Sequence, residues 1–268
     1  MIVSPPIGKK LPLDELAFTK KGEVCYFIDP SVIKPTDDEA GQVALSKSGE
    51  EWYPKITDKH RLTIFIAGNP GAGKSYLATE LINLIPRGSE GIDVLLFTAL
   101  EEPDGNFEKL SKDTRLWKIK LDAENLSRIT LSVIRERCKH PVLLFDDIDK
   151  IRDSKISNAV YKLLEDALAN GRGHKKHDGT DDVHVVTTSH AINDYRKTKY
   201  MFENSDYVAL FPQSTTATQL TRIFDKMGFP RELCESVKKL GRFDGVRRII
   251  IRKIAPMYLI AGPNITLV

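Results

Sequence analysis

The stretch Gly68-Asn69-Pro70-Gly71-Ala72-Gly73-Lys74-Ser75 decides the fold of this chain. An apolar run at 62–67 precedes it and a helical pattern at 76–82 follows it, so the order strand, glycine loop, helix is predicted. The stretch matches G-x-x-x-x-G-K-[ST] at every fixed position. At that spacing, successive backbone N–H groups surround a polyphosphate, and the start of the helix adds its positive dipole end. Nucleotide binding is therefore the first prediction.

Each part of this loop has an expected role toward ATP and Mg²⁺. The glycines allow the backbone to approach the phosphates closely. Lys74 should reach the β- and γ-phosphates, and the Ser75 hydroxyl should bind Mg²⁺. A glycine-rich turn is the alternative, but the flanking strand and helix patterns favour a phosphate loop. The predicted nucleotide-binding residues are Gly68, Asn69, Pro70, Gly71, Ala72, Gly73, Lys74, Ser75 and Tyr76.

The composition predicts a globular protein of a cytosol-like compartment. The 268 residues are 41% hydrophobic, which is ample for a buried core. No run of eighteen apolar residues and no secretory leader pattern occurs, so we expect a soluble protein that is not secreted. The three cysteines are widely spaced and predict no metal site. Net charge is +3, but Lys and Arg outnumber Asp and Glu by six between Gln219 and Lys253, where either DNA contact or a solvated surface would fit.

The alternation of apolar runs and helical patterns predicts an α/β fold. Runs of strand length lie at 62–67, 93–99, 115–120, 141–146, 183–188 and 206–211, and the clearest helical patterns lie at 75–85, 123–139 and 154–169. We predict a P-loop NTPase with a mostly parallel central sheet flanked by helices. Residues 1–59 are expected to be a small N-terminal elaboration, and 60–268 an ATPase domain with a C-terminal extension containing β-strands.

A second motif is the apolar strand at 141–145 that ends in Asp146 and Asp147, as a Walker B element does. Asp146 is predicted to hold Mg²⁺, and Asp147 to polarise the attacking water. A strand-end pair of acids also begins turns, although the phosphate loop favours the catalytic interpretation. About seventy residues separate Ser75 from Asp146, which predicts at least one further strand and helix between the two motifs, and motif strands that are not sheet neighbours.

Two further candidates follow in the chain. The run at 184–190 is a strand with a polar C-terminal end, where Thr188, Ser189 or His190 would sense the γ-phosphate or its water, or would serve structure alone. The polar loop at 169–182 carries Arg172, which an oligomer would place against a neighbour's γ-phosphate as an arginine finger. From the residues alone, an exposed arginine without a specific role fits as well.

In order, these motifs resemble the genome-packaging ATPases of large double-stranded DNA viruses, virophages and related mobile elements, within the FtsK/HerA superfamily. The resemblance covers 60–268 and is carried by Asn170-Gly171-Arg172-Gly173-His174, Thr187-Thr188-Ser189-His190 and the strand at 206–212 that ends in Phe-Pro. It implies that Arg172 is a trans-acting finger. The chain departs from the superfamily at Asp147 and His190, where Glu and Gln are frequent, so the resemblance leaves the catalytic base open.

The resemblance implies an ATP-hydrolysing motor that moves double-stranded DNA into a capsid. Its implied partners are double-stranded DNA, capsid proteins and further copies of the chain in a pentameric or hexameric ring, in the host cytoplasm or the virion, with no membrane span. Asp147, Arg172 and His190 are the catalytic candidates. The alternatives are an AAA+ replication initiator or helicase loader, a small-molecule kinase, and a protein that binds nucleotide without hydrolysing it.

Overall fold

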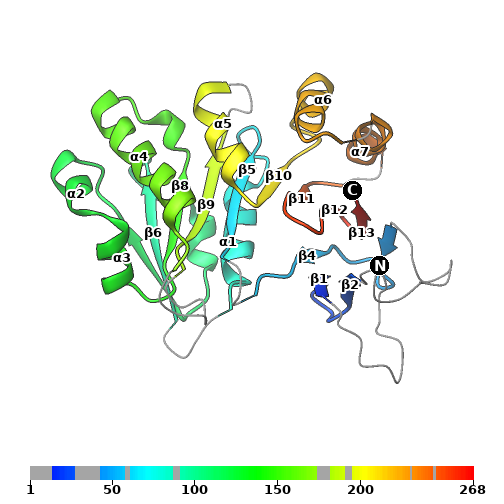
Figure 1. Ribbon diagram of the computed structural model, residues 1–268, viewed down its shortest axis with the longest axis horizontal. Coiled ribbons are helices and arrows are strands. Elements are labelled where there is room, and N and C mark those ends of the chain that lie inside the picture. The colour runs from blue at the N-terminus through cyan, green and yellow to red at the C-terminus, as the bar shows by residue number, and fades with distance from the viewer. Residues whose placement is uncertain are drawn as a thin grey trace. The chain divides into compact units, whose positions relative to one another are not determined.

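The computed structural model describes residues 14–27, 43–57, 61–86, 91–173, 182–190, 195–229, 231–243 and 246–268 (Figure 1). The chain divides into two compact units, Ile56–Val208 and a second unit formed by Met1–Lys55 with Ala209–Val268. The division of the chain into 1–59 and 60–268 stays a prediction. Most of the polar loop at 169–182, namely residues 174–181 with His174, lies outside the described residues.

A parallel sheet forms the centre of the Ile56–Val208 unit, in the order β5-β9-β8-β6-β7. Its strands are β5 (Thr63–Ala67), β6 (Ile92–Thr98), β7 (Thr114–Lys118), β8 (Val142–Asp146) and β9 (His184–Ser189). The predicted α/β class is confirmed. Strand β9 lies between β5 and β8, so the strands of the two nucleotide motifs are separated, as the sequence predicted.

The apolar runs of the sequence become buried strands because helices cover both faces of this sheet. Every residue of β5, β6, β8 and β9 is buried, whereas the edge strand β7 is largely exposed. Figure 1 shows α2, α3 and α4 on one face and α1 on the other. The helices of this unit are α1 (Lys74–Asn83), α2 (Ala123–Arg128), α3 (Leu131–Arg137), α4 (Ser154–Asn170) and α5 (Tyr195–Asn204), with short 3₁₀ turns η1 (Gly105–Lys109) and η2 (Ile148–Lys150).

One predicted helix is wrong in extent. The pattern at 123–139 suggested a continuous helix, but the structure has α2 and α3 with a break at residues 129 and 130. Ile129 and Thr130 adopt extended backbone angles, and the Thr130 hydroxyl accepts a hydrogen bond from the Val133 N–H (3.3 Å). Thr130 therefore starts a new helix as its N-cap, a choice that β-branched residues with a hydroxyl favour over continuing a helix.

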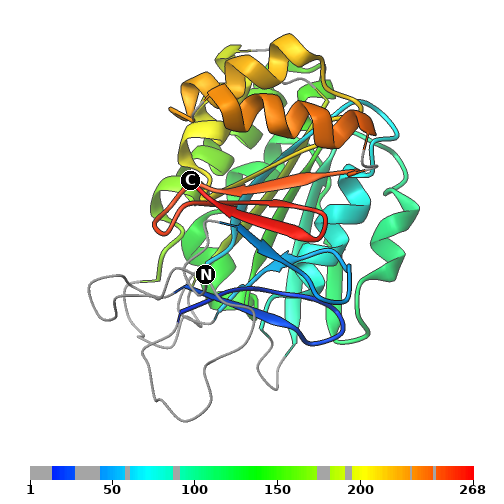
Figure 2. The same ribbon diagram turned by 90° about the vertical axis from the view of Figure 1, so that its right-hand side faces the viewer.

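The second unit is built of antiparallel strands and two helices. Strands β1 (Asp14–Phe18), β2 (Val24–Phe27) and β4 (Tyr53–Pro54) form one small sheet, and β11 (Ile249–Arg252), β12 (Tyr258–Ala261), β13 (Asn264–Leu267) and β3 (Val43–Leu45) pair in that order. Strand β10 (Tyr207–Leu210) leads from the first unit to α6 (Ala217–Lys226) and α7 (Arg231–Phe243). Figure 2 shows these two helices, in orange, beside each other.

Hydrogen bonds join the N-terminal and C-terminal segments within this second unit. The Trp52 indole donates to the Pro263 carbonyl (2.8 Å), and the Tyr258 hydroxyl donates to the Leu16 carbonyl (2.9 Å). Both side chains are almost fully buried, so each polar end is satisfied inside the core as burial requires. The strand elements expected at both ends of the chain are therefore present.

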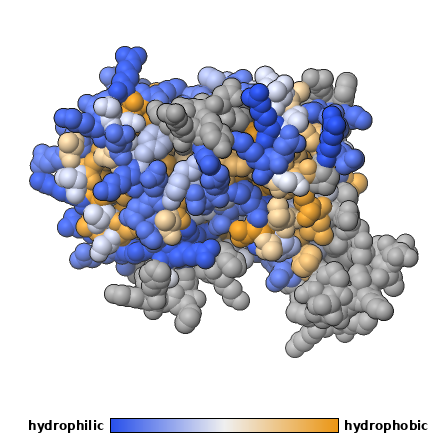
Figure 3. Space-filling model, turned by 45° about the horizontal axis from the view of Figure 1, so that its top comes forward, coloured by the Kyte–Doolittle hydropathy of each residue, from blue (hydrophilic) through white to orange (hydrophobic). Residues whose placement is uncertain are grey.

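Figure 3 shows mainly hydrophilic residues on the visible face, with hydrophobic residues in smaller areas. Among the residues that the structure describes, no helix has both the length and the apolar character needed to cross a bilayer.

Candidate active site

The phosphate loop lies at the carboxyl end of β5 and leads into α1. Gly71 and Gly73 have φ angles of 77° and 100°, in the left-handed region that favours glycine. The Gly68 N–H donates to the Ser189 carbonyl at the end of β9 (3.2 Å), which ties the loop to the neighbouring strand. Because β5, β9 and β8 are parallel neighbours, their carboxyl ends bring the loop, Ser189 and the Asp146–Asp147 pair to one edge of the sheet.

Lys74 faces the polar end of β9. Its ammonium group lies 2.9 Å from Nδ1 of His190 and 3.4 Å from the Asn69 carbonyl. Burial lowers the pKa of Lys74, while the charges of Asp147 and Asp146 act in the opposite direction. The two nearby carboxylates thus stabilise the charged form of the buried Lys74 ammonium group, which can bind polyphosphate.

Thr188 links the two Walker B acids. Its hydroxyl donates to Oδ1 of Asp146 (2.7 Å) and accepts a hydrogen bond from the Asp147 N–H (3.1 Å). Asp146 is 2% exposed, and burial raises its pKa to about 6 despite the hydrogen bond from Thr188. A carboxylate buried in this way favours the approach of a cation.

Asp147 stands in an unusual conformation at the end of β8. Its φ is 50°, a left-handed angle that few residues other than glycine adopt and that is enriched at functional sites. One carboxylate oxygen, Oδ2, lies 2.6 Å from Nε2 of His190 and accepts a hydrogen bond from Lys150 (3.2 Å). The other oxygen, Oδ1, is buried without a hydrogen-bond partner among the described residues. That oxygen has the chemistry to accept a hydrogen bond from a water molecule.

Ser75 and Asp146 were the predicted metal ligands, and both lie at this edge. No cluster of three or more His, Cys, Asp or Glu that could hold a metal ion occurs among the described residues. One serine hydroxyl and one carboxylate nonetheless fit Mg²⁺, which keeps several waters and takes further oxygens from the phosphates.

Asp104, before η1, is a neighbour of this site that the sequence analysis missed. Burial alone would raise its pKa, but hydrogen bonds from the Asn106 backbone and from the Ser75 side chain bring it below the usual range. The turn η1 is attached to α1, since the Thr79 hydroxyl donates to the Asn106 carbonyl (3.2 Å). The spacing of Asp104 from either motif carries no signal, because this packing of η1 on α1 is what brings it to Ser75.

Arg172 lies away from this edge. It follows α4 directly, and the Val183 N–H donates to the Gly171 carbonyl (2.8 Å) just before β9 begins. Strand β9 runs for six residues from there to Ser189, so the Arg172 backbone and the phosphate loop lie at opposite edges of the sheet, roughly 20 Å apart. The structure therefore brings Lys74, Ser75, Asp146, Asp147 and His190 together and leaves Arg172 apart. Tyr76 is exposed, and its hydroxyl donates to Glu80 (3.0 Å).

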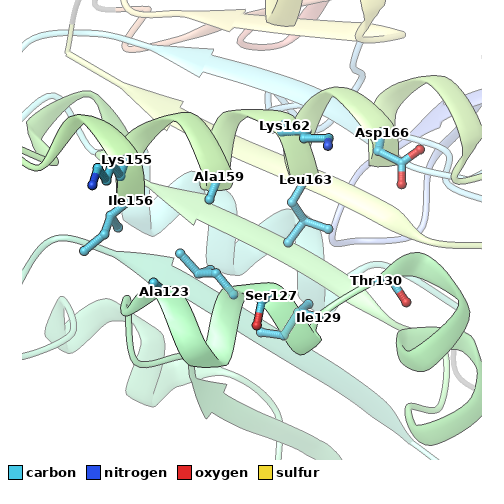
Figure 4. Close-up of a pocket in the computed structure, with 11 residues that line it drawn as sticks. Ala123, Ser127, Ile129, Thr130, Lys155, Ile156, Ala159, Lys162, Leu163 and Asp166 are labelled. Carbon is cyan, nitrogen blue, oxygen red and sulfur yellow. The ribbon is translucent and has the colours of Figure 1, made fainter.

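A separate hollow of about 480 Å³ lies between α2 and α4. Figure 4 shows Ile156, Ala159 and Leu163 of α4 facing Ala123 and Ile129 of the α2 segment, with Lys162 and Asp166 farther out on α4. None of the predicted site residues lines this hollow.

A family model supplies the deciding comparison. Residues 64–205 match the "ATPase family associated with various cellular activities (AAA)", and these residues are more than half of the chain. The chain belongs to the AAA family. This AAA protein is therefore an ATPase, and the matched residues run from β5 to the end of α5.

The AAA ATPase is also similar to individual proteins. It is 25% identical to "Uncharacterized protein V3" of the Sputnik virophage over 229 residues, which are 83% of this chain and 84% of that protein. Among solved structures, the genome packaging NTPase B204 from Sulfolobus turreted icosahedral virus 2 in complex with ATP-gammaS has 13% identity and a TM-score of 0.46, covering 78% of this chain and 99% of that chain. VirB4 of Thermoanaerobacter pseudethanolicus has 11% identity and a TM-score of 0.43, covering 98% and 97%.

Proposed function

We propose that this AAA ATPase is the subunit of a homo-oligomeric ring that uses ATP hydrolysis to move double-stranded DNA into a viral capsid. The ring would be a pentamer or hexamer, would work in the host cytoplasm or on the virion, and would meet capsid proteins. The order of motifs from Gly68 to the strand ending at Phe211-Pro212 supports the proposal, as does the virophage relative that aligns with 83% of the chain.

The observation that supports this proposal most directly is the position of Arg172, far from the phosphate loop of its own subunit. An arginine finger stabilises the charge that develops on the transferred phosphoryl group, so its guanidinium must contact that group. Arg172 lies at the far edge of the sheet from its own phosphate loop. If it acts on ATP, it acts on the ATP of another subunit, and the active site lies between neighbours in a ring.

Within one subunit, the other residues divide the remaining roles. Lys74 binds the β- and γ-phosphates, and the backbone of 68–75 surrounds them. Ser75 and Asp146 would hold Mg²⁺, which when bound neutralises phosphate charge. Asp147 orients the attacking water through Oδ1, which has no hydrogen-bond partner among the described residues, while Nε2 of His190 lies 2.6 Å from its Oδ2.

A second function, helicase loading or replication initiation, has one observation in its favour. Helices α6 and α7 directly follow β10, and a pair of helices after the core is what an AAA+ lid would require. Such a protein would end in a helical lid with a sensor arginine, whereas here the strands β11, β12 and β13 come last. Stimulation of the ATPase by bare duplex DNA favours translocation, and stimulation by a helicase partner favours loading.

Arg247 and Arg248 both belong to the basic segment between Gln219 and Lys253, and they differ in exposure. Arg248 is 9% exposed, and its guanidinium lies 3.0 Å from a Glu51 carboxylate oxygen. It also lies over the Tyr53 ring, 5.0 Å from the centroid. Arg248 therefore stabilises the second unit, and Arg247, which is exposed, remains the candidate.

Mixing two inactive variants tests the ring. Lys74→Ala should lose ATP binding, and Arg172→Ala should bind ATP normally but hydrolyse it on the order of 10³-fold more slowly. In a mixed ring, some interfaces pair the intact loop of one variant with the intact finger of the other. Phosphate release should then reappear. Differently tagged variants would be co-purified to verify mixed rings, and no recovery in such rings would show that Arg172 does not act between subunits.

A further inference from the structure

The backbone on the α3 side of Arg172 is held by another arginine. Nη2 of Arg135, in the last turn of α3, donates to the Asn170 carbonyl (2.7 Å) and to the Arg172 carbonyl itself (3.0 Å). These two carbonyls flank the end of α4, where carbonyl groups have no partner within the helix. A single guanidinium therefore joins the last residue of α4 to the residue that carries the proposed finger.

The opposite side of the same loop is attached to the start of β9. The Gly173 N–H donates to Oδ1 of Asp182 (2.6 Å), and the Val183 N–H donates to the Gly171 carbonyl (2.8 Å). Hydrogen bonds to a charged group are stronger than those between neutral groups. Residues on both sides of Arg172 thus have fixed backbone positions.

Arg61 is a third residue that fixes this loop, through carbonyl groups at the end of α4. It is 8% exposed, donates from Nη1 to the Ala167 carbonyl (2.7 Å), and also contacts the Leu168 carbonyl. A Cβ on Gly171 would lie 2.2 Å from Nη1 of Arg61 and 2.4 Å from the Ala167 carbonyl, so residue 171 has to be glycine for this packing. Burial lowers the pKa of Arg61, and the charge of Arg172 adds to that effect while Asp206 and Asp182 oppose it.

In contrast to its backbone, the Arg172 side chain is exposed and forms no hydrogen bond or ion pair with the described residues. An arginine on a fixed backbone, with its guanidinium directed to solvent and other guanidinium groups nearby, is prepared to bind an anion from outside the subunit. Fixing the backbone beforehand removes part of the entropy cost of that contact.

We propose that Arg135 and Asp182 are positioning residues for Arg172: they hold residues 170–173 so that the finger enters the neighbouring subunit's phosphate site at the correct place. This inference rests on the proposed trans-acting role of Arg172. Because a misplacement of about 1 Å costs on the order of 10²-fold in rate, loss of either anchor should slow hydrolysis substantially. Neither residue touches the subunit's own nucleotide, so ATP affinity should stay unchanged.

The test compares Arg135→Ala with Arg137→Ala, which changes an exposed arginine on the same helix that forms no hydrogen bond with the described residues of the loop. Arg135→Ala should lower kcat by about 10- to 100-fold with an unchanged KM for ATP and unchanged ring assembly, and Arg137→Ala should match wild type. The double variant Arg135→Ala/Arg172→Ala should be no slower than Arg172→Ala, because the two residues act as one unit.

Asp182 provides a second, independent pair of variants. Asp182→Asn keeps an oxygen that can accept the Gly173 N–H and should retain most activity, whereas Asp182→Ala should resemble Arg135→Ala. If Arg135→Ala does not fold, the two Asp182 variants test the positioning role by themselves.

The outcomes separate this inference from the proposed function. If Arg172→Ala is slow while Arg135→Ala and Asp182→Ala match the control, the positioning role is wrong and the finger stands. If Arg172→Ala hydrolyses ATP at the wild-type rate, the trans-acting finger itself is wrong. A further loss in the double variant would show that Arg135 acts by some other route.

Discussion

Nε2 of His190 lies 2.6 Å from Oδ2 of Asp147, so the residue that follows β9 contacts the acid expected to orient the attacking water. On its other side, Nδ1 of His190 lies 2.9 Å from the Lys74 ammonium. An ammonium group can only donate hydrogen bonds, so Nδ1 accepts from Lys74, and Nε2 is the ring nitrogen that lies beside Asp147. One imidazole therefore connects the phosphate loop with the end of β8.

Replacing His190 should separate catalysis from binding. His190→Ala should leave ATP affinity close to wild type and slow hydrolysis by about 10²-fold, because Asp147 loses the imidazole beside its Oδ2. His190→Gln keeps an acceptor for Lys74 and a polar group beside Asp147, and should recover part of the rate. Single-turnover phosphate release together with ATP titrations would measure both effects. Equal rates for His190→Ala and wild type would leave the histidine with a structural role only.

Asp147→Asn should bind Mg-ATP and hydrolyse it at least about 10²-fold more slowly, since an amide is a much poorer acceptor for the proton of the water. Asparagine tolerates the left-handed φ of 50° at this position, so the fold should survive. Circular dichroism and ATP titration provide the controls. Turnover near the wild-type rate would move the water-orienting role to another residue, with His190 the next residue to change.

Asp146→Asn should stabilise the protein without nucleotide and weaken metal-dependent binding. Burial raises the pKa of Asp146 to about 6, so the folded state favours the protonated acid, and stability falls as pH rises from about 4 to 6. The neutral variant escapes this cost, and its Tm in EDTA should exceed that of wild type at pH 8 more than at pH 5. Its ATP affinity should also lose its dependence on Mg²⁺. An identical Tm difference at both pH values would contradict the conclusion that burial of the ionised Asp146 carboxylate destabilises the folded state.

His184 should contribute to acid denaturation. Its imidazole is buried at the start of β9, where Nδ1 accepts the Leu62 N–H (2.8 Å), and burial lowers its pKa to about 3. An unfolded histidine binds a proton near pH 6.5, so this stability is present above pH 6.5 and is lost as pH falls toward 3. The loss approaches about 1.4 kcal/mol per pH unit for one proton. His184→Asn keeps an acceptor for Leu62 and should flatten the dependence of unfolding free energy on pH between 6 and 4; an unchanged slope would assign the effect to other groups.

Exposed basic residues of the second unit should bind duplex DNA through phosphates. Arg247 and Lys239 are exposed, and changing both to Glu should weaken duplex binding and flatten its dependence on salt, because fewer counterions are released. Lys112→Glu, an exposed site in the other unit, is the matched control and should behave like wild type. The measurement is duplex affinity at several salt concentrations. A salt slope equal to wild type would assign Arg247 and Lys239 to ordinary solvated surface.

The sequence by itself determined the α/β class and most of the residues of the candidate site. Short-range patterns carry that information: the spacing of glycines with Lys74 and Ser75 dictates local backbone geometry, and apolar runs of strand length dictate a sheet buried on both faces. Asp146, Asp147 and His190 were predictable for the same reason, since residues at the carboxyl ends of parallel strands meet at one edge. The Thr130 break was missed because a local hydrogen bond competed with a continuous helical pattern.

Only the tertiary structure determined which residues far apart in the sequence lie in contact. Asp104 reaches Ser75 because η1 packs on α1, and Arg135 reaches Arg172 because α3 lies beside the end of α4; neither pair has a spacing that a local pattern detects. The separation of Arg172 from its own phosphate loop likewise depends on strand direction, since β9 runs from one edge of the sheet to the other. A sequence motif reflects the local backbone geometry of one segment, whereas contacts between segments depend on how the whole chain packs.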